Sequence, residues 1–122
     1  MIKDYSKNYH DLTKSISELE LKIPQVMKGF NTLHKAALVD GVLSTKTKEL
    51  IALGIAITVR CDGCIAFHVQ HALSSGATSQ EIIETIGVAV LMGGGPAVVY
   101  GCEAMEALEQ FIVLEKNGKE TS

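Results

Sequence analysis

The stretch RCDGCIAFHVQHALSSGA, residues 60–77, decides how the middle of this chain folds. It contains no proline, and Gly76 can adopt the left-handed backbone conformation in which helices commonly end. We therefore predict one helix from about Cys61 to about Gly76.

The reactive side chains of this predicted helix share one face. Each residue turns a helix by about 100°, which places four of them within an arc of about 80°: Cys61, Cys64, His68 and His71. The cysteines fall in the first turn, where free N–H groups and the positive end of the helix dipole favour a thiolate. His68 follows Cys64 by one turn, within reach of its sulfur for proton transfer. The pattern suits an activated thiol beside a resolving thiol, with a base on the same helix.

Helical signals continue upstream of this stretch. Spaced leucines and isoleucines predict a helix over residues 5–21, and Pro24 ends it or opens a second helix that runs to about residue 39. Ser44 can cap a third helix, over residues 45–59, by accepting a backbone N–H of the first turn. Residues 55–59 are β-branched enough for a strand, but no second alternating run accompanies them, so a sheet is disfavoured.

The downstream half predicts two more helices. Thr78-Ser79-Gln80-Glu81 has the pattern of a capping box and opens a helix to about Met92. Gly93-Gly94-Gly95-Pro96 lacks the Lys-Ser/Thr of a phosphate loop and predicts a tight turn, after which Pro96 starts the last helix. Cys102 on that helix is expected to be a small buried hydrophobe. The fold class is all-α, a compact bundle of about six helices.

Length and composition restrict the possible partners. The 122 residues form one expected domain, residues 1–122, with a helical part (1–32), a central module (33–115) and a polar tail (116–122). A net charge of −3 and scattered lysines argue against nucleic acid and anionic membrane as partners. Hydrophobic residues make up 47% of this small chain, so we expect part of its apolar surface to contact other copies.

The sequence also indicates where the protein works. The first ten residues, MIKDYSKNYH, have no apolar core of a secretory signal, and we expect a cytoplasmic protein without structural disulfides. The longest apolar run, Leu50 to Val59, is about half of the ~20 residues that cross a bilayer.

Two other interpretations of the cysteines and histidines stay open. Two Cys and two His are ligands that tetrahedral zinc accepts, but four ligands on one face of one helix cannot easily surround an ion, so we expect no metal. Alternatively, the cysteines are small core residues and His68 is a histidine satisfied within its helix. His71 is expected to be a supporting or surface residue, and His10 and His34 have no partner visible in the sequence.

The wider spacing resembles a known family. The chain has the pattern Glu49-x11-Cys61-x2-Cys64-x3-His68, preceded by TKELIAL around the glutamate and followed by HALSSGA and EIIE. This pattern resembles the alkylhydroperoxidase D-like branch of the carboxymuconolactone decarboxylase superfamily, from about Leu33 to Phe111.

The resemblance implies roles for these residues. In that branch the second cysteine reacts with peroxide, which corresponds to Cys64, and the first, here Cys61, resolves the sulfenic acid as a disulfide. Glu49 and His68 match the glutamate and histidine of the family's proton relay. The best-studied type has a histidine just before the reactive cysteine, where this chain has Gly63.

The resemblance also implies an all-helical homotrimer or homohexamer with its site near subunit contacts. We expect a thiol-dependent peroxidase or disulfide reductase that needs no cofactor and takes hydroperoxides, or other small oxidants, and an unidentified dithiol reductant. A non-catalytic thiol redox sensor is an alternative. A lyase of the carboxymuconolactone decarboxylase type ranks behind both, because decarboxylase members generally lack the cysteine pair.

Overall fold

The computed structural model describes residues 3–121, with side chains as far as residue 117. Within that range the chain forms six helices and no strand, which confirms the all-α prediction. The helices are α1 (Tyr5–Lys22), α2 (Pro24–Leu38), α3 (Thr45–Thr58), α4 (Asp62–Ser74), α5 (Ser79–Gly93) and α6 (Gly95–Thr121). None of these helices is both long enough and apolar enough to cross a membrane, as far as residues 3–121 go.

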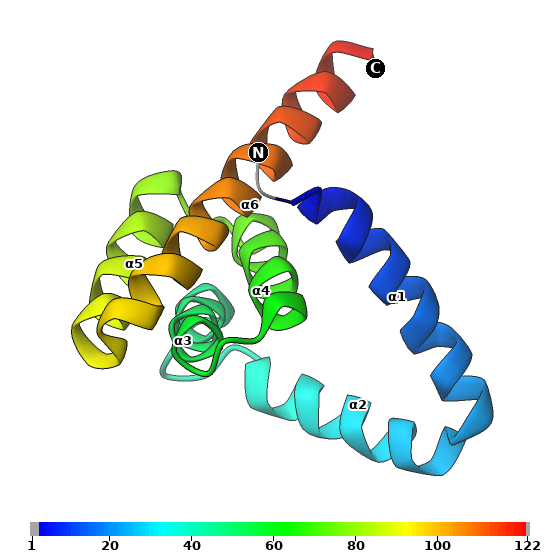
Figure 1. The fold of residues 1–122 in the computed structure, drawn as a ribbon. Helices are drawn as coiled ribbons and strands as arrows, with labels where there is room; N and C mark the ends of the chain where they lie inside the picture. The colour runs from blue at the N-terminus through cyan, green and yellow to red at the C-terminus, as the bar shows by residue number, and fades with distance from the viewer. Residues whose placement is uncertain (1–2, 122) are drawn as a thin grey trace.

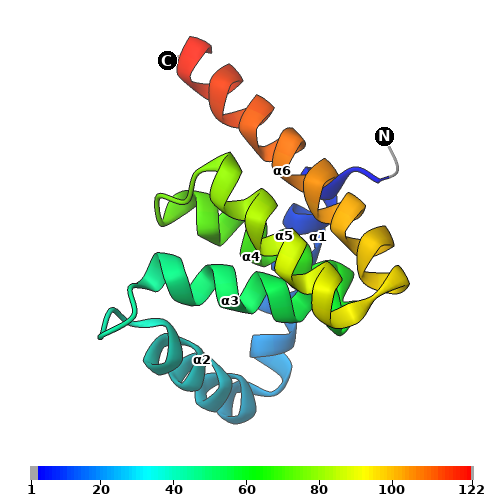
Figure 2. The same cartoon turned by 90° about the vertical axis from the view of Figure 1, so that its left-hand side faces the viewer.

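The six helices divide into a bundle and an arm. Helices α3, α4, α5 and α6 pack on one another, while α1 and α2 form a V-shaped arm beside them (Figure 1). Within the arm, α1 packs on α4 and α6, and α2 packs on α1 and α3. The view turned by 90° shows α3 and α5 side by side, with α2 below α3 (Figure 2).

The core lies between α3, α4, α5 and α6, with one residue from α1. Its largest fully buried side chains are Tyr5, Leu53, Ile57, Ile65, Val69 and Ile82. Helix α2 contributes no buried residue at all. Burial of apolar side chains therefore fixes the bundle and the start of α1, but not α2.

Local signals set the helix ends as the sequence predicted. The Ser44 hydroxyl accepts the Thr47 N–H at the start of α3, and Thr78 and Glu81 form a reciprocal capping box at the start of α5. Gly76 follows α4 with φ +94°, the left-handed conformation expected there.

The glycine run makes a tight turn between α5 and α6, as predicted. Gly94 has φ +68° and separates the two helices. A Cβ on Gly93 would meet the Ala97 Cβ at 2.7 Å, so the absence of a side chain lets the helices approach closely here. Helix α6 continues to Thr121, through most of the residues 116–122 that the sequence assigned to a polar tail; Ser122 lies outside the described residues.

One burial prediction on α6 is wrong. Cys102 is a free and exposed cysteine, not a buried one. The buried face of α6 runs through Ala97, Ala104 and Ala107, and a helix carries residue 102 to the opposite side.

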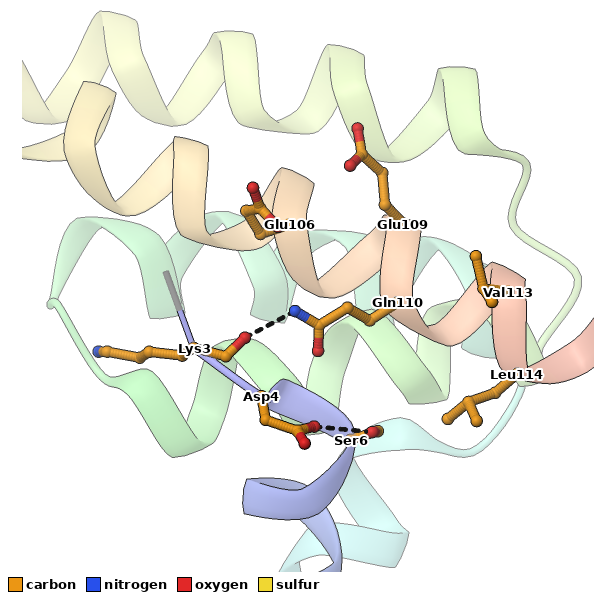
Figure 3. A pocket seen from close by; sticks show the side chains of 8 residues that line it. All are labelled: Lys3, Asp4, Ser6, Glu106, Glu109, Gln110, Val113 and Leu114. Carbon is orange, nitrogen blue, oxygen red and sulfur yellow. Dashed lines mark hydrogen bonds between the residues drawn. The ribbon is translucent and has the colours of Figure 1, made fainter. Parts of the chain in front are cut away.

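Polar contacts fix the start of α1 against α6. The Gln110 amide donates to the Lys3 carbonyl oxygen over 2.6 Å, and the Tyr5 N–H donates to Gln110 Oε1 over 2.7 Å. Figure 3 shows this junction, a pocket of about 600 Å³ lined also by Asp4, Ser6, Glu106, Glu109, Val113 and Leu114. The Lys3 ammonium reaches Asp62 at 2.5 Å, at the first position of α4. The arm is thus joined to the helix that carries the cysteines.

Candidate active site

The two cysteines lie where α4 begins. Arg60 has φ +61°, unusual for a residue other than glycine, and it turns the chain from α3 into α4. Cys61 is the N-cap of α4, so the helix begins one residue later than its first cysteine. Its sulfur accepts the Cys64 N–H over 3.2 Å and is bonded to the Cys64 sulfur as a disulfide. The pair is therefore held together at the positive end of the helix.

Glu49 and His68 meet across the interface between α3 and α4. The Glu49 side chain is 3% exposed, and its Oε2 lies 2.6 Å from Nδ1 of His68. Burying a carboxylate costs free energy unless a partner compensates its charge, and the imidazole is that partner. The fold thus brings together two residues that lie 19 positions apart in the sequence.

His71 joins this pair from the next turn of α4. Its Nδ1 lies 3.9 Å from Glu49 Oε1, and its Nε2 lies 3.5 Å from the Tyr9 hydroxyl. Burial lowers the pKa of His71, and the nearby Glu49 charge opposes that effect. His71 is thus half-buried beside the carboxylate. This position suits a supporting residue better than a surface residue.

Tyr9 is a neighbour of the site that the sequence did not reveal. It reaches α4 because α1 docks there, and its ring packs 4.8 Å from Phe67 and 5.7 Å from Phe111, between centroids. The helical pattern of residues 5–21 predicts α1 but does not say which helix it contacts, so no signal could have identified Tyr9.

A pocket of about 530 Å³ opens over the cysteines. His68, His71 and both cysteines line it on the α4 side, and α1 and α2 supply an apolar wall opposite. That wall contains Leu12, Ile16, Met27 and Phe30, together with the polar Asn31 and His34. Glu49 lies behind His68 and does not line the pocket. Small molecules can therefore reach the sulfurs and the imidazoles from the same space, while the carboxylate stays covered.

Gly63 has a structural counterpart on α1. A Cβ at this position would lie 2.8 Å from Cδ2 of Leu12. Leu12 thus occupies space beside the cysteines into which a larger residue at position 63 would project. An apolar side chain thus covers the position at which the best-studied type of the family that the sequence resembles has a histidine.

The arrangement can perform two kinds of chemistry. The disulfide, or the dithiol it yields on reduction, can exchange electrons, and the carboxylate with its imidazoles can move protons. A cluster of potential metal ligands also exists, formed by Glu49, His68 and His71 without the cysteines. The zinc site considered from sequence would have used the cysteines, so this cluster is a different one.

In a comparison with known protein families, residues 24–107 match the sequence pattern of the carboxymuconolactone decarboxylase family. A family protein of Legionella pneumophila has a crystal structure that matches with a TM-score of 0.85 and 45% identity, over 88% of this chain and 96% of that one. A Thermotoga maritima family protein, for which a part in an antioxidative response has been suggested, matches with a TM-score of 0.83 and 31% identity, over 91% and 95% of the chains. An uncharacterized protein of Cupriavidus necator is 33% identical over 105 residues, 86% of this chain and 93% of the relative.

Proposed function

Because this chain belongs to the carboxymuconolactone decarboxylase family, we propose that it is a thiol-dependent peroxidase that reduces hydroperoxides through Cys61 and Cys64. The suggested antioxidative role of the Thermotoga maritima relative agrees with this assignment. A cytoplasmic location would supply the dithiol reductant that the cycle needs.

One arrangement supports this function above all. A buried carboxylate contacts an imidazole at 2.6 Å, and that imidazole lines the same pocket as a vicinal cysteine pair. A core histidine and two structural cysteines would need neither the buried charge nor the opening. Acid–base groups beside a potential nucleophile in a pocket are typical of active sites.

The proposed cycle begins with the reduced pair. The Cys64 thiolate attacks one oxygen of the hydroperoxide, so that an S–O bond forms and the O–O bond breaks. His68, backed by Glu49, accepts the thiol proton before the attack and returns a proton to the departing alkoxide, which leaves as an alcohol.

The disulfide then completes the cycle. The Cys61 thiol attacks the Cys64 sulfenic acid, the S–S bond forms, and the oxygen leaves as water. A dithiol reductant donates two electrons and two protons and restores both thiols. The bonded sulfurs of Cys61 and Cys64 correspond to the oxidised state of this cycle.

We further propose that the protein works as a homotrimer or homohexamer. Helices α3 and α5 leave an apolar groove of about 520 Å³ open on the surface of one chain. Its wall includes Ile51, Ile55, Val59, Val88 and Met92, each at least 49% exposed. Apolar patches that remain exposed on a single chain commonly mark contacts between subunits.

Hydroperoxide consumption with a dithiol regenerant tests the proposed function. The wild-type protein is expected to consume cumene hydroperoxide over many turnovers in the presence of dithiothreitol. Cys64→Ser should abolish turnover, because the attacking thiolate is gone. In a separate experiment without dithiothreitol, pre-reduced Cys61→Ser should react once and leave a sulfenic acid on Cys64, detectable by mass spectrometry after trapping with dimedone.

Cys102→Ser provides the matched control, since Cys102 is a free and exposed thiol outside the pocket. Its activity should equal that of the wild type. Continued hydroperoxide consumption by Cys64→Ser, or the absence of a sulfenic acid on Cys64 in Cys61→Ser, would contradict the assigned roles. Oxidation that changes the assembly size without multiple turnovers would instead identify a redox sensor.

A further inference from the structure

Glu49, His68 and His71 bring three potential metal ligands together from two helices. One ligand atom of each lies within 4.8 Å of the other two. The histidines come from adjacent turns of α4, and α3 supplies the carboxylate from the side. The cluster therefore does not depend on ligands from a single helix, which was the geometric objection to a zinc site at the cysteines.

The distances in this cluster come near those of a small transition-metal site once the hydrogen bond between Glu49 and His68 opens. Zinc binds imidazole nitrogen at about 2.0–2.1 Å and carboxylate oxygen at about 2.0–2.2 Å, so neighbouring ligand atoms of a tetrahedral site lie roughly 3.3–3.5 Å apart. The two separations from the Glu49 oxygens to the imidazole Nδ1 atoms, 2.6 Å and 3.9 Å, lie on either side of that value. The His71 side chain is 32% exposed and can rotate to close the longer gap.

The surroundings of His71 also suit a ligand. Its Nε2 lies 3.5 Å from the Tyr9 hydroxyl, which can accept an N–H from that nitrogen. Metal-binding histidines usually donate their second nitrogen to an oxygen acceptor in this way, because the contact fixes the ring and leaves the other lone pair free for the ion. The Tyr9 ring is in turn held by Phe67 and Phe111.

From these contacts we propose that Glu49, His68 and His71 form a binding site for a divalent ion of the zinc class, with one coordination position open to the pocket. The ion takes the carboxylate and the imidazole of the proposed proton relay, so the metal-bound form is expected not to run the peroxidase cycle. Two histidines and one glutamate, plus a water molecule, are a ligand set that zinc uses where it stays accessible. His68 and His71 line the pocket, so a water molecule can complete the coordination from that side. The buried carboxylate supplies the negative charge that the ion requires.

Titration of the disulfide form with metal salts tests this site. In that form the two sulfurs are bonded to each other and cannot act as thiolate ligands, and the result does not depend on whether the protein consumes hydroperoxide. Calorimetry with zinc chloride is expected to give one ion per chain. Cobalt chloride should give the visible absorption bands of four-coordinate Co²⁺, and zinc should displace them.

Variants of His71 decide the ligand assignment. His71→Ala and the larger His71→Gln should each raise the zinc dissociation constant by at least about tenfold, while far-ultraviolet circular dichroism reports whether the helices persist. His10→Ala is the matched control, because His10 is an exposed histidine of α1 outside the cluster, and its affinity should equal that of the wild type. Substoichiometric binding, unchanged affinity in both His71 variants, or an equal loss in His10→Ala would overturn the proposal.

Discussion

Glu49 is a charged side chain that the fold removes almost entirely from water. Its position costs desolvation, and the short contact with His68 Nδ1 offsets that cost. The buried Glu49 carboxylate also constrains His68, because the contact fixes the tautomer and the orientation of the imidazole. At the scale of single residues, the proposed peroxidase therefore depends on a group that does not line the pocket.

Replacing Glu49 with glutamine tests this dependence. The Glu49→Gln side chain has nearly the same shape but no charge, so it cannot hold a proton on His68 or take one from it. We expect the rate of hydroperoxide consumption to fall by roughly 10²- to 10⁴-fold, the usual contribution of a positioned acid–base group. Stopped-flow measurement of Cys64 oxidation would check this, and activity near the wild-type level would contradict the relay.

The local part of the site could be predicted from sequence, whereas its surroundings could not. Cys64 and His68 are four positions apart, and helical geometry alone places them one turn apart. The part of Glu49 came from a family resemblance, since no local rule joins residues 19 positions apart. Tyr9 and Leu12 reach the site through the docking of α1, which periodicity does not specify. Cys102 was placed wrongly because α6 is apolar on its exposed face as well.

Individual helices begin and end where short-range chemistry dictates. The hydroxyls of Ser44 and Thr78 each accept the backbone N–H three residues further on, and the Glu81 carboxylate accepts the Thr78 N–H. Because these contacts span only three residues, the sequence alone predicts the boundaries. The start of α4 differs by one residue because Arg60 takes up a left-handed conformation that arginine disfavours. Two backbone hydrogen bonds at the end of α3 hold this turn, from the Arg60 N–H to the Ile57 oxygen and from the Cys61 N–H to the Ala56 oxygen.

The capping box of α5 predicts a dependence of stability on pH. The Glu81 pKa is lowered from its usual 4.5, mainly by the hydrogen bond from the Thr78 N–H and then by the Lys46 ammonium 3.0 Å away. The folded state therefore favours the carboxylate, and the resulting stability is present above pH 4.5 and is lost as the pH falls through the lowered folded value. Glu81→Gln should reduce stability at pH 7 and should lose less stability than the wild type on acidification.

Urea unfolding at pH 7 and at a pH below 4 would measure both effects. Glu84→Gln is the matched control, because Glu84 is an exposed glutamate on the next turn of the same helix. Its acid dependence should follow that of the wild type. An identical loss of stability in the wild type and Glu81→Gln would show that the charge of Glu81 does not stabilise the fold.

A single copy of the molecule leaves many large apolar side chains exposed to solvent. The groove between α3 and α5 is the clearest case, and Ile55 and Val88 on its walls are 57% and 63% exposed. The sequence indicated such a surface only through its high apolar content. Which helices form it depends on how the bundle packs.

A charge in this groove should disrupt assembly. Ile55→Lys places an ammonium where the proposed oligomer buries hydrocarbon, so we expect a shift from trimers or hexamers towards monomers. Sedimentation velocity would measure the change, and Ser15→Lys, on an exposed position of α1, is the control for the added charge. Unchanged assembly in Ile55→Lys would exclude this groove as the subunit contact.

Helix α2 forms part of the pocket wall without burying a side chain of its own. Little free energy holds such a helix in place, so it should open more often than α3, and its amide hydrogens should exchange with deuterated solvent sooner. Peptide-level exchange followed by mass spectrometry would show the difference in one chain. Met27 and Phe30 would then line an entrance of variable width. It would admit a bulky substrate when α2 opens and cover a small one when α2 closes.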